Sequence, residues 1–150
     1  MNTATENRTV ARMAIEQVCA RGDMDLAPSC YAEDFADYFA SSEYHGLEGV
    51  RKSTELYRQL FDDLRFEVVD QVAEDNRVAN RWVLTGSNRG RRVKLWGITL
   101  SELRDGRIVE DWTGFDSLEL VRQLGLLRTL LAAPKLVAAG RRRTAPAIRE

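Results

Sequence analysis

The sequence predicts an α+β fold, with three helices, a curved and mostly antiparallel sheet, and a closing helix. Apolar residues at helical spacing occur mainly before residue 62, whereas residues 66–116 mostly alternate between apolar and polar side chains. Within this second region, Asp105-Gly106 separates two alternating runs. An Asp-Gly pair in this setting strongly indicates a hairpin, because a type I′ turn needs positive φ at both central residues. Helices and antiparallel strands that are segregated along a chain are typical of the α+β class.

The first two expected helices lie before residue 32. Residues 5–21 carry apolar side chains at i, i+3, i+4 and i+8 spacing, which predicts an amphipathic helix. Gly22 is expected to end this helix, since glycine suits the left-handed position just past a helix terminus. A short second helix is expected over residues 25–31, with Pro28 in its first turn, where proline is tolerated.

Two further helices flank most of the predicted strands. The third spans residues 46–61 and carries its apolar residues mainly on one side. The fourth begins after Asp116, a good N-cap residue that is followed by Glu119 three positions later.

Strands are expected over residues 34–39, 66–74 and 77–85, in addition to the hairpin at residues 92–116. The polar residues 40–45 predict a loop, and residues 86–90 predict a turn into the hairpin. The strand at residues 34–39 contains Asp37 among aromatic side chains, a position in which a carboxylate needs an explanation.

Alternation assigns the side chains of the hairpin to two faces, because successive strand residues point to opposite sides. One face carries Trp96, Ile98, Leu100, Ile108 and Trp112. The other carries Gly97, Thr99, Ser101, Val109, Asp111 and Thr113. In one interpretation the apolar face is the protein core and the polar face is hydrated. In the other, the polar face lines a pocket and a second subunit covers the apolar face, which would otherwise be an unusually large exposed patch.

The length and composition predict a single globular domain. The chain has 150 residues, of which 44% are hydrophobic and 30% are charged. We expect one domain over residues 1–136 and a basic tail without a fold of its own over residues 137–150. Twenty-two basic and 23 acidic residues give a net charge of −1, so we expect neither nucleic-acid nor membrane partners. No apolar stretch resembles a membrane span or a secretory signal, and we expect a cytoplasmic protein.

Residues that usually hold metals or nucleotides are scarce in this sequence. His45 is the single histidine, and Cys19 and Cys30 are the two cysteines, so no Cys/His cluster predicts a zinc site. No phosphate-binding glycine loop or dinucleotide-binding motif is present. We therefore expect any chemistry to need neither a metal nor a nucleotide cofactor.

Six short motifs, together with the order of the elements, carry a family resemblance. They are HGLEGV (45–50), FDDL (61–64), RVANRW (77–82), TG (85–86), DGRIVEDW (105–112) and RQLG (122–125). With these motifs the chain resembles the SnoaL-like polyketide cyclases, which belong with ketosteroid isomerase to the nuclear-transport-factor-two-like superfamily. The resemblance covers roughly residues 8–127 and is more specific for the fold than for the reaction, since this fold supports many activities.

The resemblance implies a cone-shaped α+β barrel with an internal pocket. In this family a curved sheet wraps around the N-terminal helices and leaves a deep apolar pocket at the open end. Family members commonly form dimers through the outer face of the sheet. The resemblance thus favours the second interpretation of the hairpin and implies a homodimer through Trp96, Ile98, Leu100 and Trp112.

The resemblance also identifies the positions of the usual catalytic residues. Cyclases of this kind form a carbon–carbon bond through an enolate, with an acid/base pair on the two hairpin strands and no cofactor. By position that pair corresponds to Thr99 and Thr113, neither of which can act as a carboxylate or imidazole base. Asp37 matches the position of the general base of ketosteroid isomerase, and Ile15 matches the position of its oxyanion tyrosine.

Two carboxylates are therefore the candidate catalytic groups. Asp37 is the expected base, and Asp111, on the same strand face as Thr113, is the expected second acid/base group. Burial in an apolar pocket raises a carboxyl pKa toward neutrality, which suits proton transfer at carbon. Two structural alternatives stay open: Asp37 caps a backbone amide, and Asp111 pairs with an arginine across the sheet.

Six further residues are candidates for substrate binding. They are Tyr38, Thr99, Thr113, Trp82, Asn88 and Ile15. The three hydroxyl-bearing residues would orient a substrate oxygen, and Asn88 would donate its amide at the mouth of the pocket. A turn residue at Asn88 and core packing for Trp82 are the structural alternatives.

The sequence supports three functional hypotheses. The first is a cofactor-free cyclase or isomerase that acts by acid–base catalysis on a small, apolar, ketone-bearing molecule such as a polyketide intermediate. The second is an epoxide-opening hydrolase or a pyran-forming cyclase that uses the same carboxylates. The third is a small-molecule-binding protein without catalysis, which the threonines at the usual acid/base positions favour.

Overall fold

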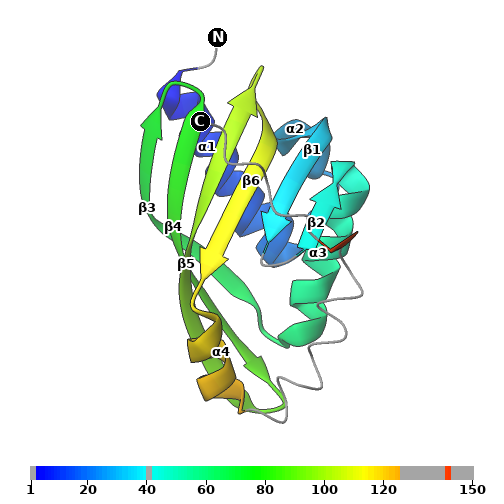
Figure 1. Ribbon diagram of the computed structural model, residues 1–150, viewed down its shortest axis with the longest axis vertical. Helices are drawn as coiled ribbons and strands as arrows, with labels where there is room; N and C mark the ends of the chain where they lie inside the picture. Colours follow the sequence, from blue (N-terminus) through cyan, green and yellow to red (C-terminus); the bar gives the residue numbers. More distant parts are fainter. Residues whose placement is uncertain (1–2, 40–41, 126–140, 143–150) are drawn as a thin grey trace.

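The computed structural model describes residues 3–39, 42–125 and 141–142. These residues form a curved, open sheet, and the helices α1, α2 and α3 lie on one face of it (Figure 1). We call the face that these helices cover the inner face and the opposite face the outer face. The predicted α+β class with a curved, mostly antiparallel sheet is confirmed.

Within the described residues the sheet has seven strands in the order β3-β4-β5-β6-β1-β2-β7. Their bounds are β1 (Tyr31–Phe39), β2 (Ser42–His45), β3 (Arg65–Glu74), β4 (Arg77–Asn88), β5 (Arg91–Arg104), β6 (Arg107–Phe115) and β7 (Arg141–Arg142). Neighbouring strands are antiparallel except β1 and β6, which run parallel. The first strand of the chain therefore lies beside the last long one.

Two predicted connections are shorter than expected. Residues 42–45 of the expected loop form β2, whose polar sequence gives no alternating pattern and which is held by pairing with β1. Residues 86–88 of the expected turn belong to β4, and the tight turn consists of Arg89-Gly90, both with positive φ. Apart from β7, the predicted tail at residues 137–150 lies outside the described residues.

The helices begin and end close to the predicted residues. Their bounds are α1 (Ala4–Met13), η1 (Ala14–Cys19), α2 (Ala27–Cys30), α3 (Gly46–Leu60) and α4 (Ser117–Leu124). Thr3 and Glu6 form a capping box at the start of α1, and Asp116 caps α4 by accepting from Glu119 N–H. The expected single helix over residues 5–21 is an α-helix that continues directly into the π-helix η1.

The β5–β6 hairpin has the faces that the pocket interpretation expects. Gly97, Thr99 and Ser101 are buried on the inner face. Trp96, Ile98 and Leu100 lie on the outer face, where 60%, 46% and 41% of their surface is exposed.

Ile108 is an exception to the predicted faces of the hairpin. It is buried in the core with Leu103 rather than placed on the outer face. The register shifts between Glu102, which pairs with Glu110, and Leu103, which pairs with Ile108. The extra residue on β6 is Val109, and this β-bulge reverses the alternation on either side of it.

Two clusters of buried apolar residues fill the space between the sheet and the helices. The first is Ala11, Ala14, Val18, Ala27, Cys30, Tyr31, Phe35, Val50, Val78, Leu103 and Ile108. The second is Ile15, Phe61, Val68, Trp82, Leu84, Val93, Leu95 and Leu124. The second cluster includes a residue of α4, so this short helix closes one end of the core.

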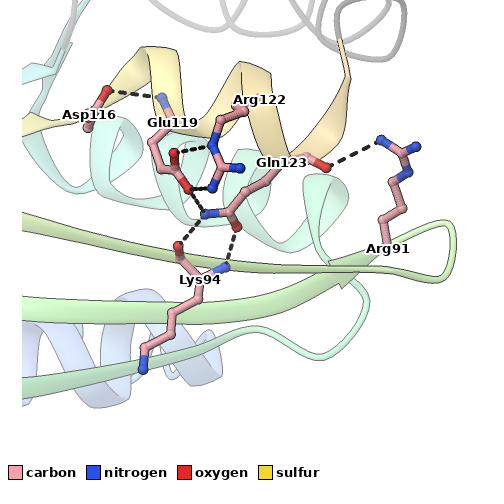
Figure 2. Close-up of polar contacts among 6 residues, drawn as sticks. All are labelled: Arg91, Lys94, Asp116, Glu119, Arg122 and Gln123. Atoms are coloured by element: carbon pink, nitrogen blue, oxygen red, sulfur yellow. Dashed lines mark hydrogen bonds and ion pairs between the residues drawn. The ribbon is translucent and has the colours of Figure 1, made fainter.

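Side-chain hydrogen bonds fasten α4 to β5 (Figure 2). The Gln123 amide donates to Lys94 O at 2.8 Å and accepts from Lys94 N–H at 2.7 Å. Arg91 Nη1 donates to Leu124 O at 3.0 Å, at the C-terminus of the helix. β6 pairs with β5 only from Gly97 onward, so it does not reach the first residues of β5. The contacts from Gln123 supply hydrogen bonds to backbone groups on this part of the strand edge.

Gly97 gives a test of how tightly the inner face is packed. A Cβ at this position would lie 2.5 Å from Trp82 Cη2 and 2.7 Å from Gly114 O, whereas a Cβ at Gly114 would meet no atom within 4 Å. We expect Gly97→Ala to lower the free energy of unfolding by about 1–3 kcal/mol, as overpacked substitutions do. Urea unfolding measures this, with Gly114→Ala as the matched control. Equal stability of the two variants would contradict the packing of Trp82 over Gly97.

Candidate active site

Two carboxyl groups lie side by side on the inner face of the sheet. Asp37 on β1 is paired with Asp111 on β6 in the register of these parallel strands. Paired residues on neighbouring strands point to the same face, with their backbones about 5 Å apart. Strand pairing alone thus brings together two acids that are far apart in the sequence.

Both carboxyl groups line a pocket of about 40 Å³ between the sheet and the helices. Its other lining residues are Ile15, Cys19, Tyr31, Phe35, Val50, Ser53, Tyr57, Phe66, Trp82, Thr99 and Thr113. They include members of both core clusters, so the pocket lies between the clusters. The lining is mainly apolar and aromatic, as is usual for sites that bind small organic molecules.

Asp111 is buried and holds one strong hydrogen bond. Ser101 lies opposite it on β5, and Ser101 Oγ donates to Asp111 Oδ1 at 2.5 Å. Burial raises the pKa of Asp111 to about 7, although the Ser101 hydroxyl opposes this shift by stabilising the carboxylate. The expected alternative, an arginine partner across the sheet, is not what the structure shows, because this side of β5 carries a serine.

Asp37 has a pKa well above the ordinary range of aspartate. Burial is the main cause, and the neighbouring charge of Asp111 adds to it. Two like charges this close in an apolar pocket disfavour each other, so the pair keeps a proton at pH values at which exposed aspartates are ionised. A neutral carboxyl group and a carboxylate are the two forms that acid–base catalysis requires.

The threonines at the family's usual acid/base positions form a separate hydrogen-bonded group. Thr99 Oγ1 and Thr113 Oγ1 lie 2.9 Å apart on paired positions of β5 and β6. Trp82 Nε1 donates to Thr99 Oγ1 at 3.0 Å. These two hydroxyl groups are therefore hydrogen-bonded to each other beside the carboxyl pair, and both threonines line the same pocket.

Three helical residues that the sequence interpretation missed, Ser53, Tyr57 and Cys19, bring further hydroxyl and thiol groups to the pocket. Tyr57 comes from α3 and Cys19 from η1, and burial raises the pKa of Cys19 to about 12 and that of Tyr57 well above its usual value. Both are thus neutral at physiological pH. The sequence does indicate Tyr57, because this residue carries a hydroxyl group on the apolar side of its helix. Ile15 and Cys19 both reach the pocket from the π-helix, a feature that often marks functional sites.

The structure brings six of the eight predicted site residues to the pocket. They are Asp37, Asp111, Thr99, Thr113, Trp82 and Ile15. Tyr38 lies on the outer face, because it follows Asp37 in the strand, and its ring stacks on that of Trp112 with centroids 4.3 Å apart. Asn88, at the end of β4, donates its side-chain amide to Leu60 O at 2.6 Å and is absent from the pocket lining.

Within residues 3–39, 42–125 and 141–142, no group of three or more His, Cys, Asp or Glu side chains is arranged to hold a metal ion. None of the helices in the same part of the chain is long and apolar enough to cross a membrane.

Comparison with protein families agrees with the fold. The family model described as SnoaL-like polyketide cyclase matches residues 9–124. The chain belongs to this family. No curated protein matches the chain by sequence.

Solved structures of SnoaL-like proteins resemble this chain over most of its length. A protein from Bacillus cereus ATCC 10987 that is assigned as a polyketide cyclase is 27% identical, with a TM-score of 0.74 and coverage of 82% of this chain and 83% of that one. IdmH from Streptomyces antibioticus, also assigned as a polyketide cyclase, is 26% identical, with a TM-score of 0.66 and coverage of 80% and 98%. A SnoaL-like protein from Jannaschia sp. CCS1, at 20% identity and a TM-score of 0.74 over 82% and 94%, supports the fold alone.

The raised pKa of Asp111 predicts a pH-dependent cost to stability. A carboxyl group whose pKa is about 7 in the folded protein and about 4 in the unfolded chain binds more protons when folded, so its contribution falls as the pH rises through this window. We expect Asp111→Asn to stabilise the protein relative to wild type by about 2–4 kcal/mol at pH 8, and by progressively less down to pH 4.

Thermal or urea unfolding across pH 4–8 measures this difference. Asp105→Asn is the matched control, because Asp105 lies in the exposed turn of the same hairpin. We expect this variant to follow the wild-type profile. A stability difference for Asp111→Asn that does not grow with pH would show that Asp111 is not held in an environment that disfavours its charge.

Proposed function

We propose that this SnoaL-like chain is a cyclase or isomerase that acts by acid–base catalysis on a small, apolar, ketone-bearing substrate such as a polyketide intermediate. The observation that carries the proposal is the pair of carboxyl groups, Asp37 and Asp111, on adjacent strands in an apolar pocket. Their raised pKa values support one neutral and one ionised member near neutral pH. Structural similarity to proteins assigned as polyketide cyclases supports the class of substrate.

In the proposed reaction the two carboxyl groups act on the same ketone. The carboxylate accepts a proton from the carbon next to the carbonyl, while the neutral carboxyl group donates its proton to the carbonyl oxygen, which gives an enol. The enol then attacks an electrophilic carbon of the same molecule in a cyclisation, or is protonated at another carbon in an isomerisation. Thr99 and Thr113 are placed to orient a substrate oxygen beside the pair.

The size of the pocket sets a condition on substrate entry. About 40 Å³ accommodates a few water molecules, whereas a ring-containing substrate needs several times this volume. Tyr57 and Phe66 pack edge-to-face in the lining, with ring centroids 5.6 Å apart. We infer that these rings rotate or separate when the substrate binds.

We also propose that the chain forms a homodimer through the outer face of the sheet. Trp96, Ile98 and Leu100 lie in a row on β5 with their side chains 41–60% exposed, and Trp112 lies on the adjacent strand. Burial of such a row against a second copy would remove an apolar patch of the size that marks interaction sites.

Hydrogen exchange at a ketone tests the proposed chemistry without knowledge of the natural substrate. We expect the protein to accelerate deuterium incorporation next to the carbonyl of 2-tetralone in D₂O, measured by NMR. Asp37→Asn and Asp111→Asn should each reduce this rate by about 10²-fold or more, because each removes a proton-transfer group. Asp34→Asn, on the same strand as Asp37, and Asp105→Asn, in the same hairpin as Asp111, are the exposed controls and should exchange at the wild-type rate.

Other outcomes of this experiment distinguish the remaining hypotheses. Saturable binding of 2-tetralone without any exchange would contradict the proposal and favour a binding protein. Hydrolysis of styrene oxide with incorporation of ¹⁸O from water, lost in both pocket variants, would favour the epoxide-opening alternative.

Disruption of the apolar row tests the proposed dimer. We expect Ile98→Glu to convert the protein from dimer to monomer in sedimentation velocity, because it places a charge at the centre of the row. Leu118→Glu is the control, since Leu118 is also highly exposed but belongs to α4 and not to a strand of the sheet. A wild-type protein that sediments as a monomer at high micromolar concentration would contradict the proposal.

A further inference from the structure

The carboxyl pair belongs to a row of four inner-face residues, one on each of four neighbouring strands. The two end residues of this row differ in whether they donate a hydrogen bond to the carboxyl group beside them. The row is Ser101 on β5, Asp111 on β6, Asp37 on β1 and Tyr44 on β2, each paired in register with the next. Ser101 donates to Asp111 at 2.5 Å. At the other end, the Tyr44 hydroxyl is buried and has no hydrogen-bond partner among the described residues, Asp37 included.

We propose that Ser101 is a positioning residue that holds Asp111 as the ionised base and leaves Asp37 as the neutral acid. The inference rests on the proposed acid–base function and assigns the two roles within it. It reverses the role that the family resemblance suggests for Asp37. Ser101 does not line the pocket, so it acts on the reaction only through Asp111.

The geometry of the Ser101 contact favours charge on Asp111. An O–H···O contact of 2.5 Å is in the range of hydroxyl–carboxylate hydrogen bonds, which are stronger than those between neutral groups. The hydroxyl is almost completely buried with Asp111, so water does not compete for the contact. Once Asp111 is ionised, its charge disfavours a second charge on the paired Asp37.

Five other titratable groups of the described residues surround the pair, and none of them favours a second negative charge in the pocket. They are Cys19 on η1, Tyr31 on β1, Tyr44 on β2, Tyr57 on α3 and Glu110 on β6. The thiol and the three phenols are neutral at physiological pH. Glu110 lies next to Asp111 with its side chain on the opposite face, and its charge raises the pKa of Asp111, whereas the hydrogen bond from Ser101 lowers it. Neither kind of group stabilises a second carboxylate, so the proton of the pair stays on Asp37, which accepts no side-chain hydrogen bond from the described residues.

The assignment fixes the direction in which a substrate binds. The acidic C–H of the ketone would point toward Asp111 and the β5–β6 side, and the carbonyl oxygen toward Asp37 and the β1–β2 side. Asp111 takes the proton from carbon, and the Asp37 carboxyl proton goes to oxygen. Return of a proton from Asp111 to the product and of the hydroxyl proton to Asp37 restores both groups.

An NMR titration of the protein labelled with ¹³C at the aspartate carboxyl carbons tests the inference directly. The pocket signals are assigned from Asp37→Asn and Asp111→Asn. In the wild type we expect Asp111 to ionise at lower pH than Asp37. In Ser101→Ala we expect the Asp111 midpoint to rise by about 1–2 pH units and the Asp37 midpoint to fall, because the stabilising hydroxyl is lost.

Ser87→Ala is the matched control, because Ser87 Oγ donates to the exposed carboxylate of Asp63 at 2.6 Å. It should move the Asp63 signal and leave the pocket pair unchanged. Ser101→Cys keeps the approximate volume with a weaker donor, and it should shift the Asp111 midpoint in the same direction if Ser101→Ala does not fold. Wild-type titration of Asp37 before Asp111, or an unchanged order and separation in both Ser101 variants, would overturn the inference.

The titration and the ketone exchange fail independently. A wild type that shows the expected order of ionisation but no exchange retains the Ser101 assignment as a property of the pair and loses the proposed function. Exchange that depends on both carboxyl groups, together with the opposite order of ionisation, retains the proposed function and refutes the role of Ser101.

Discussion

The parallel pairing of β1 with β6 is the constraint on which the candidate site depends. A slip of one residue in this register would turn Asp37 to the outer face and Tyr38 to the inner face. Packing on both faces opposes such a slip. On the outer face Tyr38 stacks on Trp112, its partner in the register, and on the inner face the Phe39 and Phe115 rings are parallel with centroids 5.5 Å apart. Aromatic contacts thus hold the carboxyl groups together, although neither carboxyl group contributes to them.

The bulge at Val109 is the second condition for the site. Strict alternation that buries Ile108 would also turn residues 110 and 112 inward and Asp111 outward. With the bulge, Ile108 joins the apolar core and Asp111 faces the pocket on the same strand. One inserted residue therefore lets β6 contribute Ile108 to the first core cluster and Asp111 to the pocket. Bulges of this kind are common beside active sites.

The sequence predicts the parts of this structure that depend on local chemistry. The Asp105-Gly106 turn, the Asp116 cap and the inward face at Thr99 and Ser101 follow from turn preferences, capping and alternation. What it does not predict depends on contacts between distant segments. The bulge leaves no local sequence signal, so simple alternation places Ile108 on the wrong face. The polar strand β2 exists because β1 lies beside it. The adjacency of Asp37 and Asp111 likewise follows only from a parallel pairing between strands that are far apart in the sequence.

The inner face of the hairpin explains how the site has acid–base groups although the usual positions carry threonine. Thr99 and Thr113 form one row across β5 and β6. Ser101 and Asp111 form the next row, about 7 Å along the strands toward Leu103 and Ile108. In that second row β1 supplies Asp37, whereas beside the first row it supplies Phe39. The carboxyl pair therefore lies in the row that is nearer to the core cluster of Leu103 and Ile108, and desolvation raises both pKa values there. The threonine row, which cannot transfer protons at carbon, is left beside it with hydroxyl groups that suit the binding of a substrate oxygen.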